Sequence, residues 1–199
     1  EARDVKPLSP SDLGGAKALP GEGLDEEEAK ARGRRLHLLL EHLPEIAKPA
    51  WSAAAPGILA GEGTVEDAEA GALLQEAVAC LTAPHLAAIF AEGALAEVSL
   101  TADSPTLGRK LVGQIDRLIL TDTRLLAVDF KSNAVCPEGP EEVPEGLLRQ
   151  MGAYAEMLAA IYPGKTVETA ILWTREARLM PLPSHLTNPA LTRARDAHP

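Results

Sequence analysis

The sequence predicts an α/β fold in which α-helices flank a mixed central β-sheet, with an extra helical part on the N-terminal side. Two observations lead to this prediction. Ala-rich segments with helical spacing give way near residue 93 to short runs in which apolar and polar residues alternate. A further helical segment then separates three such runs from two more. At 199 residues, the chain has the size of one domain.

The N-terminal part is predicted to be an arm followed by helices. Residues 1–24 contain many prolines and glycines, which predict a linker or extended arm, with the ordered domain at residues 25–199. The helical part, residues 25–92, should begin at Asp25, because this residue and Glu28 resemble a capping box. Its predicted helical segments are Asp25–Pro44, Thr64–Leu81 and Pro84–Phe90.

The sheet is expected in a core of residues 93–183. An acidic loop with prolines, residues 137–146, interrupts this core. Prolines in and next to the last apolar run of the core predict that this strand lies at a sheet edge. The predicted strands are Leu95–Thr101, Lys110–Leu120, Arg124–Lys131, Val167–Trp173 and Arg178–Leu182, with a helix at Leu147–Tyr162. Residues 184–199 are predicted to form a C-terminal tail.

The charge of the chain limits its partners. The formal net charge is −10, which excludes binding of a polyanion by bulk positive charge, because nucleic acids are bound mainly by Lys and Arg. Any DNA site must therefore be local or assisted by metal ions. The candidate local cations are Arg109, Lys110, Arg117 and Arg149.

The cysteines and the apolar runs narrow the class of protein. Cys80 and Cys136 lack CxxC spacing, which excludes a disulfide framework, a structural zinc site and a four-thiolate cluster. This usage is typical of a reducing cytoplasm, so we expect a cytoplasmic protein. No apolar run approaches the roughly 20 residues that span a bilayer, and no membrane contact is expected. The first residue, Glu1, is not Met, which suggests a fragment of a longer chain.

Two aspartates are predicted to face each other in the sheet. In a hairpin centred on Asp122 and Thr123, the numbers of cross-strand partners add up to 245, as 116 and 129 do. Asp116 and Asp129 would then repel each other among apolar neighbours. Lys131 shares the face of Asp129 and supplies one positive charge, but a divalent metal fits paired carboxylates better. A solvent-exposed hairpin, or a bulge that changes the register, is the alternative.

Two polar pairs with helical spacing lie on either side of these strands. His37 and Glu41 flank the apolar arc of the first predicted helix, and Gln150 and Tyr154 lie on the later helix. Taken alone, His37 is explained as a hydrogen-bonded residue at the boundary of the core. Gln150 and Tyr154 are likewise explained as the polar edge of a helix, without a functional role. Gly33, one turn before His37, suggests the close approach of another backbone.

The motifs, in chain order, are Gly33-x-x-x-His37-x-x-x-Glu41, Glu97 in Ala96-Glu97-Val98, Gly113-x-x-Asp116-Arg117, Asp129-Phe130-Lys131 and Gln150-x-x-x-Tyr154. In order and spacing this series resembles that of RecB-family nucleases in the PD-(D/E)XK superfamily. The resemblance implies a restriction-endonuclease-like core. The stretch Pro10–Leu13 and the acidic, Ala-rich character resemble the C-terminal nuclease region of AddA-type helicase-nucleases.

The resemblance implies a site for Mg²⁺ or Mn²⁺. The metal ligands that it implies are His37, Asp116, Asp129 and the backbone carbonyl of Phe130. The resemblance also implies that Lys131 lies beside the attacking water, as a base or as a charge stabiliser. It implies that Glu97 holds the metal through water or binds a second ion. Gln150 and Tyr154 are implied to orient the substrate strand or the lysine.

The function implied is that of a DNA nuclease, the exonuclease module of a helicase-nuclease in double-strand-break repair and recombination. The implied partners are linear DNA ends, the single strand after unwinding, an N-terminal helicase part of the same chain and a second subunit of AddB type. A catalytically idle DNA-end or protein-docking module is the alternative, and the net charge fits it. A second alternative is a stand-alone nuclease, such as a resolvase or a restriction enzyme.

A permissive P-loop pattern at residues 159–166 is rejected, because a helix is expected before it and a strand after it. Phosphate-binding loops have the reverse order. We therefore expect no ATPase activity in this part of the chain.

Overall fold

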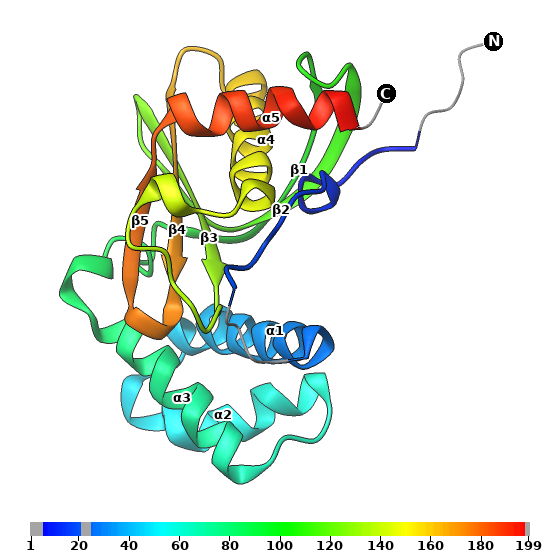
Figure 1. Cartoon of the computed structure of the whole chain (residues 1–199). Coiled ribbons are helices and arrows are strands. Elements are labelled where there is room, and N and C mark those ends of the chain that lie inside the picture. The colour runs from blue at the N-terminus through cyan, green and yellow to red at the C-terminus, as the bar shows by residue number, and fades with distance from the viewer. Residues whose placement is uncertain (1–5, 21–24, 198–199) are drawn as a thin grey trace.

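A computed structural model of the chain describes residues 6–20 and 25–197. It contains a five-stranded mixed sheet flanked by helices, which confirms the predicted fold class (Figure 1). The strands, in sheet order, are β1 (Leu95–Ser104), β2 (Arg109–Leu120), β3 (Arg124–Lys131), β4 (Thr166–Trp173) and β5 (Arg178–Leu182). Only the β3–β4 pair is parallel among these strands, and β5 lies at an edge, as its prolines predicted.

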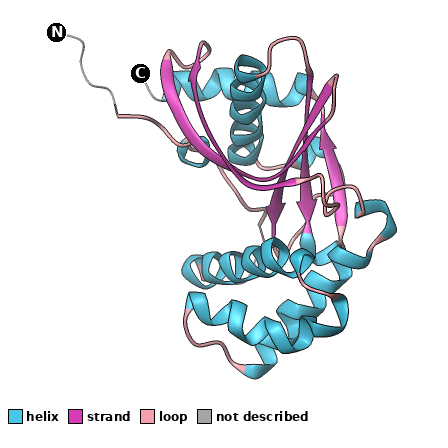
Figure 2. Ribbon diagram, turned by 180° about the vertical axis from the view of Figure 1, so that it is seen from behind, coloured by secondary structure: helices cyan, strands magenta, loops and turns pink. Residues whose placement is uncertain are grey.

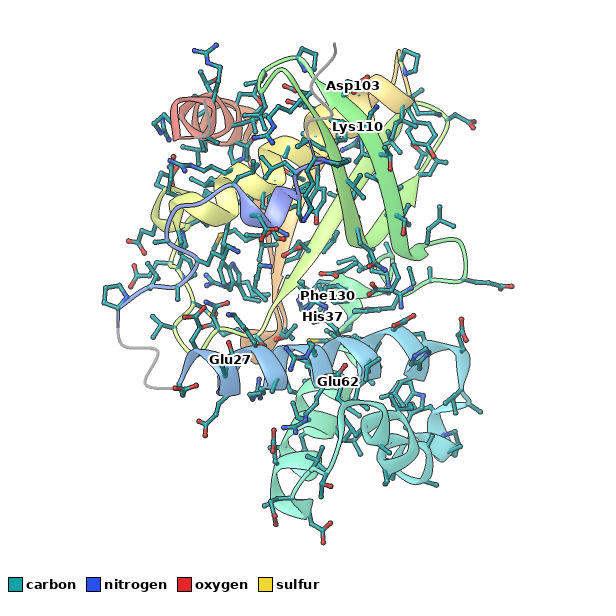
Figure 3. The ribbon with its side chains drawn as sticks, turned by 90° about the vertical axis from the view of Figure 1, so that its right-hand side faces the viewer. Glu27, His37, Glu62, Asp103, Lys110 and Phe130 are labelled. Carbon is teal, nitrogen blue, oxygen red and sulfur yellow. The ribbon has the colours of Figure 1, made fainter. Side chains whose placement is uncertain are left out.

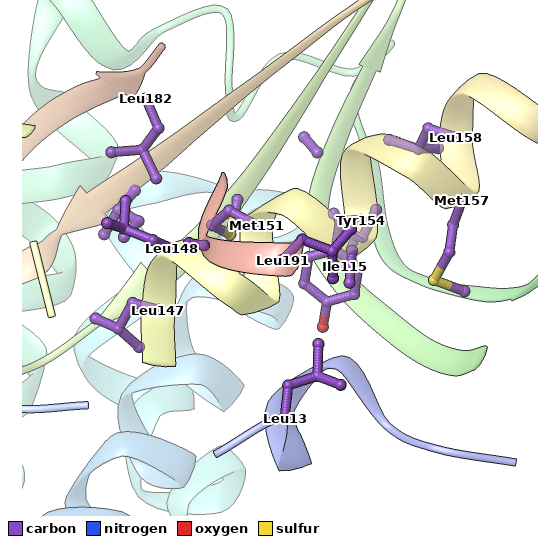
Figure 4. Close-up of a cluster of buried hydrophobic side chains, with 14 of the residues drawn as sticks. Leu13, Ile115, Leu147, Leu148, Met151, Tyr154, Met157, Leu158, Leu182 and Leu191 are labelled. Carbon is purple, nitrogen blue, oxygen red and sulfur yellow. The ribbon is translucent and has the colours of Figure 1, made fainter. Parts of the chain in front are cut away.

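Helices cover the sheet through two hydrophobic cores. The helices are α1 (Glu26–His42), α2 (Trp51–Leu59), α3 (Asp67–Thr82), α4 (Glu145–Ile161) and α5 (Ser184–Ala197). Alternate residues of β3 enter different cores: Ala127 packs with α4 and α5, whereas Val128 packs with α1, α2 and α3. Figure 2 shows the two helical groups separated by the strands, and Figure 4 shows the core beneath α4 and α5.

The hairpin register agrees with the sequence-based prediction. Arg117 pairs with Val128, and Leu120 pairs with Leu125 next to the turn. The ladder therefore continues toward Asp116 and Asp129 as adjacent cross-strand positions.

The helical part differs from prediction at α2 and α3. Helix α2 was not predicted, since its sequence contains Pro56 and Gly57. It is held by the indole of Trp51, which donates hydrogen bonds to the carbonyls of Leu43 and Ile46 (2.9 Å each), and by burial of Leu59. Helix α3 begins at Asp67 rather than Thr64 and has no side-chain cap, so the predicted start is wrong.

The N-terminal arm packs on the domain. Leu8 forms a β-bridge with Leu111, a short 3₁₀ turn follows at Pro10–Asp12, and Leu13 is 1% exposed in the core shared with α4. The expectation that ordered structure begins only at residue 25 therefore does not hold for residues 6–20. Residues 1–5 and 21–24 of the predicted arm lie outside the described residues.

The predicted C-terminal tail is helical as far as the structure describes it. Helix α5 packs closely on α4 at Gly152, where a Cβ atom would lie 2.6 Å from the carbonyl oxygen of Thr187. Burial of Leu191 and Ala194 holds the helix in place. Residues 198–199 lie outside the described part. Within the described residues, no helix combines the length and apolar character needed to cross a bilayer.

We expect Leu13→Ala to lower the free energy of unfolding by about 2–5 kcal/mol, because it empties a site in the core under α4. Urea denaturation measures this change. The control is Leu95→Ala, since Leu95 is 46% exposed and its truncation should change the unfolding free energy by less than about 0.5 kcal/mol. Equal, small effects of the two substitutions would mean that the arm does not contribute to the folded domain.

Candidate metal centre

Three acidic residues lie on neighbouring strands of the sheet. The pairs Ala96–Arg117 and Val98–Ile115 flank the position where Glu97 of β1 meets Asp116 of β2. Asp129 lies across from Asp116 on β3, by the register of that hairpin. Asp116 is 8% exposed and Asp129 is 4% exposed. The strands therefore bring three carboxylates together where water screens them poorly.

Glu97 occupies a left-handed backbone conformation, with φ of 49°. This conformation is unfavourable for a residue with a side chain, and it interrupts the β1–β2 ladder at the site. The backbone departs from regular strand geometry where the side chain of Glu97 joins the other acids.

Helix α1 places His37 against Asp116 inside β2 and against the end of β3. Its Nδ1 lies 3.3 Å from Asp116 Oδ1, and its Nε2 lies 3.1 Å from the carbonyl oxygen of Phe130. In Figure 3, His37 and Phe130 lie side by side between α1 and the sheet. The backbone N–H of Phe130 also donates a hydrogen bond to Asp116 Oδ2 (2.5 Å). Phe130 thus contributes both backbone groups to the site.

The donor atoms fit a hard divalent cation. His37, Glu97 and Asp116 each offer one ligand atom, and these three atoms lie within 4.8 Å of one another. The Oδ2 atom of Asp129 is buried and has the Lys131 ammonium 2.6 Å away as its partner. Carboxylate and carbonyl oxygens with one imidazole suit ions such as Mg²⁺ and Mn²⁺. The described residues can therefore hold a divalent metal.

Lys131 and helix α4 hold Asp129 in place. Lys131 Nζ lies 2.6 Å from Asp129 Oδ2, and Gln150 Nε2 donates a hydrogen bond to Asp129 Oδ1 (3.0 Å). Tyr154 lies behind Gln150, 3.4 Å from its amide nitrogen, and donates its hydroxyl proton to the carbonyl of Gln114 (2.6 Å). Gln150 thus contacts a site carboxylate, and Tyr154 contacts Gln150.

The glycine of the Gly113-x-x-Asp116 motif has a packing reason. A Cβ atom at position 113 would lie 3.0 Å from the ring of Tyr154 and 2.9 Å from Pro10 of the arm. Only glycine lets both groups approach the strand at this point. The motif therefore makes room for Tyr154 and for the arm.

Opposite charges set the protonation of the buried groups. Burial alone would lower the pKa of His37, but the Asp116 carboxylate outweighs it and the pKa is raised. The pKa of Asp116 is lowered, because His37 and Lys131 outweigh its burial. The pKa of Lys131 is raised despite burial, because Asp129 and Asp116 favour the ammonium form. Without a metal, both His37 and Lys131 are thus favoured as cations.

Two carboxyl groups have raised pKa values. Burial and the charges of Asp116 and Glu41 raise the pKa of Glu97 to about 7. Burial also raises the pKa of Asp129, the Lys131 ammonium lowers it in part, and Asp116 raises it further. A bound cation would favour the ionised form of both groups.

A groove of about 510 Å³ leads to the site. Its lining comes from the arm, from α1 and from the end of β3, and it includes Lys17, Lys30, Arg34, His37, Lys131 and Ser132. No sequence motif includes Lys17 or Ser132, and the one signal for Ser132 was its position directly after Lys131. Gly33 also lines the groove, and a Cβ there would lie 3.4 Å from Ser132 Oγ. The predicted close approach to Gly33 is thus made by a side chain rather than a backbone.

The cations predicted for DNA contacts are engaged within the protein. Arg117 is buried, donates a hydrogen bond to the carbonyl of Leu40 (2.9 Å) and lies over the ring of Phe90. Arg149 donates to the carbonyl of Leu13 (3.0 Å). Arg109 donates to the carbonyl of Lys6, and Lys110 forms an ion pair with Asp103. The prediction of DNA contacts is wrong for Arg117, because its guanidinium is needed inside the fold.

The P-loop-like segment has the predicted order of elements. Helix α4 ends at Ile161, and strand β4 begins at Thr166. Lys165 Nζ donates to the carbonyls of Thr121 and Asp122, at 2.7 and 2.6 Å, and so fastens the β2–β3 turn.

One comparison with known proteins covers most of the chain. A family model described as the PD-(D/E)XK nuclease superfamily matches residues 13–193. No curated protein matches the sequence. A solved structure titled "Crystal structure of SSO0001" is 10% identical, with a TM-score of 0.36 and 88% of each chain covered. That similarity is too low to inform the function of the chain.

The raised pKa of Glu97 predicts a pH dependence of the metal-free protein. The folded state keeps this proton to about pH 7, whereas the unfolded chain releases it near the ordinary value of 4.5. The folded state thus binds more protons in this window, so its stability falls as the pH rises through the window and levels off above it. We expect Glu97→Gln to flatten the fall in urea denaturation with a chelator present, and the exposed Glu92→Gln to leave it unchanged. The same pH slope in both variants would show that the Glu97 carboxyl does not carry this effect.

Proposed function

The chain belongs to the PD-(D/E)XK nuclease superfamily, and on this premise we propose that it hydrolyses phosphodiester bonds of DNA at the cluster of His37, Glu97, Asp116, Asp129 and Lys131. Nucleases of this superfamily are hydrolases that act on DNA and use divalent metals. The observation that carries the proposal is the meeting of an imidazole and buried carboxylates beside a lysine.

We assign the metal, as Mg²⁺ or Mn²⁺, to His37, Asp116, Asp129 and the carbonyl of Phe130, with Glu97 as a further ligand through water or for a second ion. When bound, such an ion activates water and stabilises negative charge on phosphoryl oxygens. Proximity of the donor atoms supports this assignment, as does the burial of the Asp129 carboxylate beside Asp116.

The other residues position the reacting groups. Lys131 contacts the attacking water or the scissile phosphate, and its ion pair with Asp129 keeps its ammonium group at the site. Gln150 fixes one oxygen of Asp129 and leaves the other toward Lys131. Tyr154 fixes Gln150 from behind.

A DNA strand would follow the groove between the arm and α1. Lys30 and Arg34, with 52% and 55% exposed side chains, form ion pairs with Glu26 and Glu62. Exposed ion pairs contribute only about 0–1 kcal/mol, so DNA phosphates can replace these carboxylates. With a net charge of −10, the chain should bind DNA weakly and lose binding steeply as salt rises.

In its finer form the proposal is an exonuclease module of an AddA-type helicase-nuclease in double-strand-break repair. The motif series at residues 33–154 supports it, as does the packing of the Pro10–Leu13 stretch on the nuclease core. The partners would be an N-terminal helicase part and a subunit of AddB type. The net charge favours a second candidate, an idle docking module with the same fold.

Cleavage by the purified chain separates the two candidates. With Mg²⁺, we expect degradation of linear DNA while a closed circle stays intact, and we expect Lys131→Met to reduce the rate by at least about 100-fold, because a charge at the reacting centre is lost. The control is Lys48→Met, an exposed lysine away from the groove. Wild-type rates in Lys131→Met would contradict the role of Lys131, and no cleavage by the wild type would favour the docking module.

A further inference from the structure

The backbone of Lys131 is held by a residue outside the motif series. Thr174 follows the last residue of β4 and is fully buried. Its single hydroxyl proton faces two acceptors, Glu76 Oε1 at 2.6 Å and the carbonyl oxygen of Lys131 at 3.1 Å, in a hydrogen bond shared between them. The contact with Lys131 joins the ends of the parallel strands β3 and β4, where Lys131 is the last residue of its strand.

The same hydroxyl is held by an ion pair between two helices. Thr174 Oγ1 lies 2.6 Å from Glu76 Oε1 on α3, and Glu76 Oε2 lies 2.5 Å from Arg32 Nη2 on α1. The side chains of Glu76 and Arg32 are 10% and 16% exposed. A chain of partly buried polar contacts therefore runs from α1, which also carries His37, to the backbone of Lys131.

We propose that Thr174 is a positioning residue for Lys131, held in place by Glu76 and Arg32. This inference rests on the role of Lys131 proposed above. A lysine side chain has many rotamers, so two anchors define where its ammonium lies: Asp129 at the Nζ end and the backbone at the other. Thr174 supplies the second anchor at the point where the chain leaves the sheet.

The neighbouring contacts support this reading. The carbonyl of Ser132 accepts a hydrogen bond from Arg175 Nε (3.1 Å), so two consecutive residues after β4 hold two consecutive carbonyls at the end of β3. The network uses the Thr174 hydroxyl, which valine lacks and serine keeps. Valine therefore removes the anchor with little change of shape, and serine retains it.

The test compares cleavage by Thr174→Val and Thr174→Ser, with Thr169→Val as the control. Thr169 is a buried threonine of β4, the strand that precedes Thr174, and its hydroxyl faces the carbonyl of Leu182 at 3.5 Å, away from Lys131. We expect kcat to fall at least about 10-fold in Thr174→Val while KM changes less than about twofold, because a small displacement of a reacting group slows chemistry. Thr174→Ser should restore kcat, and Thr169→Val should leave it unchanged. Unchanged kcat in Thr174→Val, or no rescue by serine, would overturn the proposal.

A readout without catalysis keeps this test separate from that of the proposed function. In protein with ¹⁵N-labelled lysine side chains, the Lys131 signal is identified by its loss in Lys131→Met. We expect this signal to shift in Thr174→Val and to stay in place in Thr169→Val, even if the chain cleaves no DNA. If Thr174→Val does not fold, Glu76→Gln replaces it and should shift the same signal. An unchanged Lys131 signal in the variant that folds would overturn the proposal.

Discussion

The site depends on how the mutual repulsion of Asp116 and Asp129 is offset, because both carboxylates are buried at adjacent cross-strand positions. A buried charge destabilises a fold by several kcal/mol unless it is paired and hydrogen-bonded. Separate elements each bring a partner: α1 brings His37, the end of β3 brings Lys131, and α4 brings Gln150. These partners offset part of the repulsion between the two carboxylates. A divalent ion at the same oxygens would supply more positive charge and offset more of it.

Local sequence rules predicted the sheet but not the pieces that depend on distant contacts. The register of the β2–β3 hairpin followed from its turn, because side-chain alternation and loop length determine pairing within a hairpin. Helix α2 was missed, since its propensity is poor and its stability comes from Trp51 and the burial of Leu59. In the predicted tail, Ala190, Leu191 and Ala194 recur at helical spacing, a signal that could have revealed α5.

Sequence patterns predicted those parts of the site that depend on which residues share one face of a helix or pair across a hairpin. The apolar arc of the first predicted helix placed His37 at the core boundary, and the hairpin register placed Asp116 beside Asp129. The sequence could not predict that Arg117 is used inside the fold, because its partner Leu40 lies on another element. For the same reason Thr174, far along the chain from Lys131, carries no local signal of its contact with that residue.

Calorimetric titration of the DNA-free protein with Mn²⁺ tests the central claim, that these carboxylates form one metal site. Wild type and Asp103→Asn should bind with the same affinity, because Asp103 is an exposed acid of β1 paired with Lys110. Asp116→Asn should bind at least about 10-fold more weakly, since it removes a carboxylate that faces both His37 and Glu97. Equal affinity of Asp116→Asn and wild type would contradict the account, because the metal would then bind elsewhere.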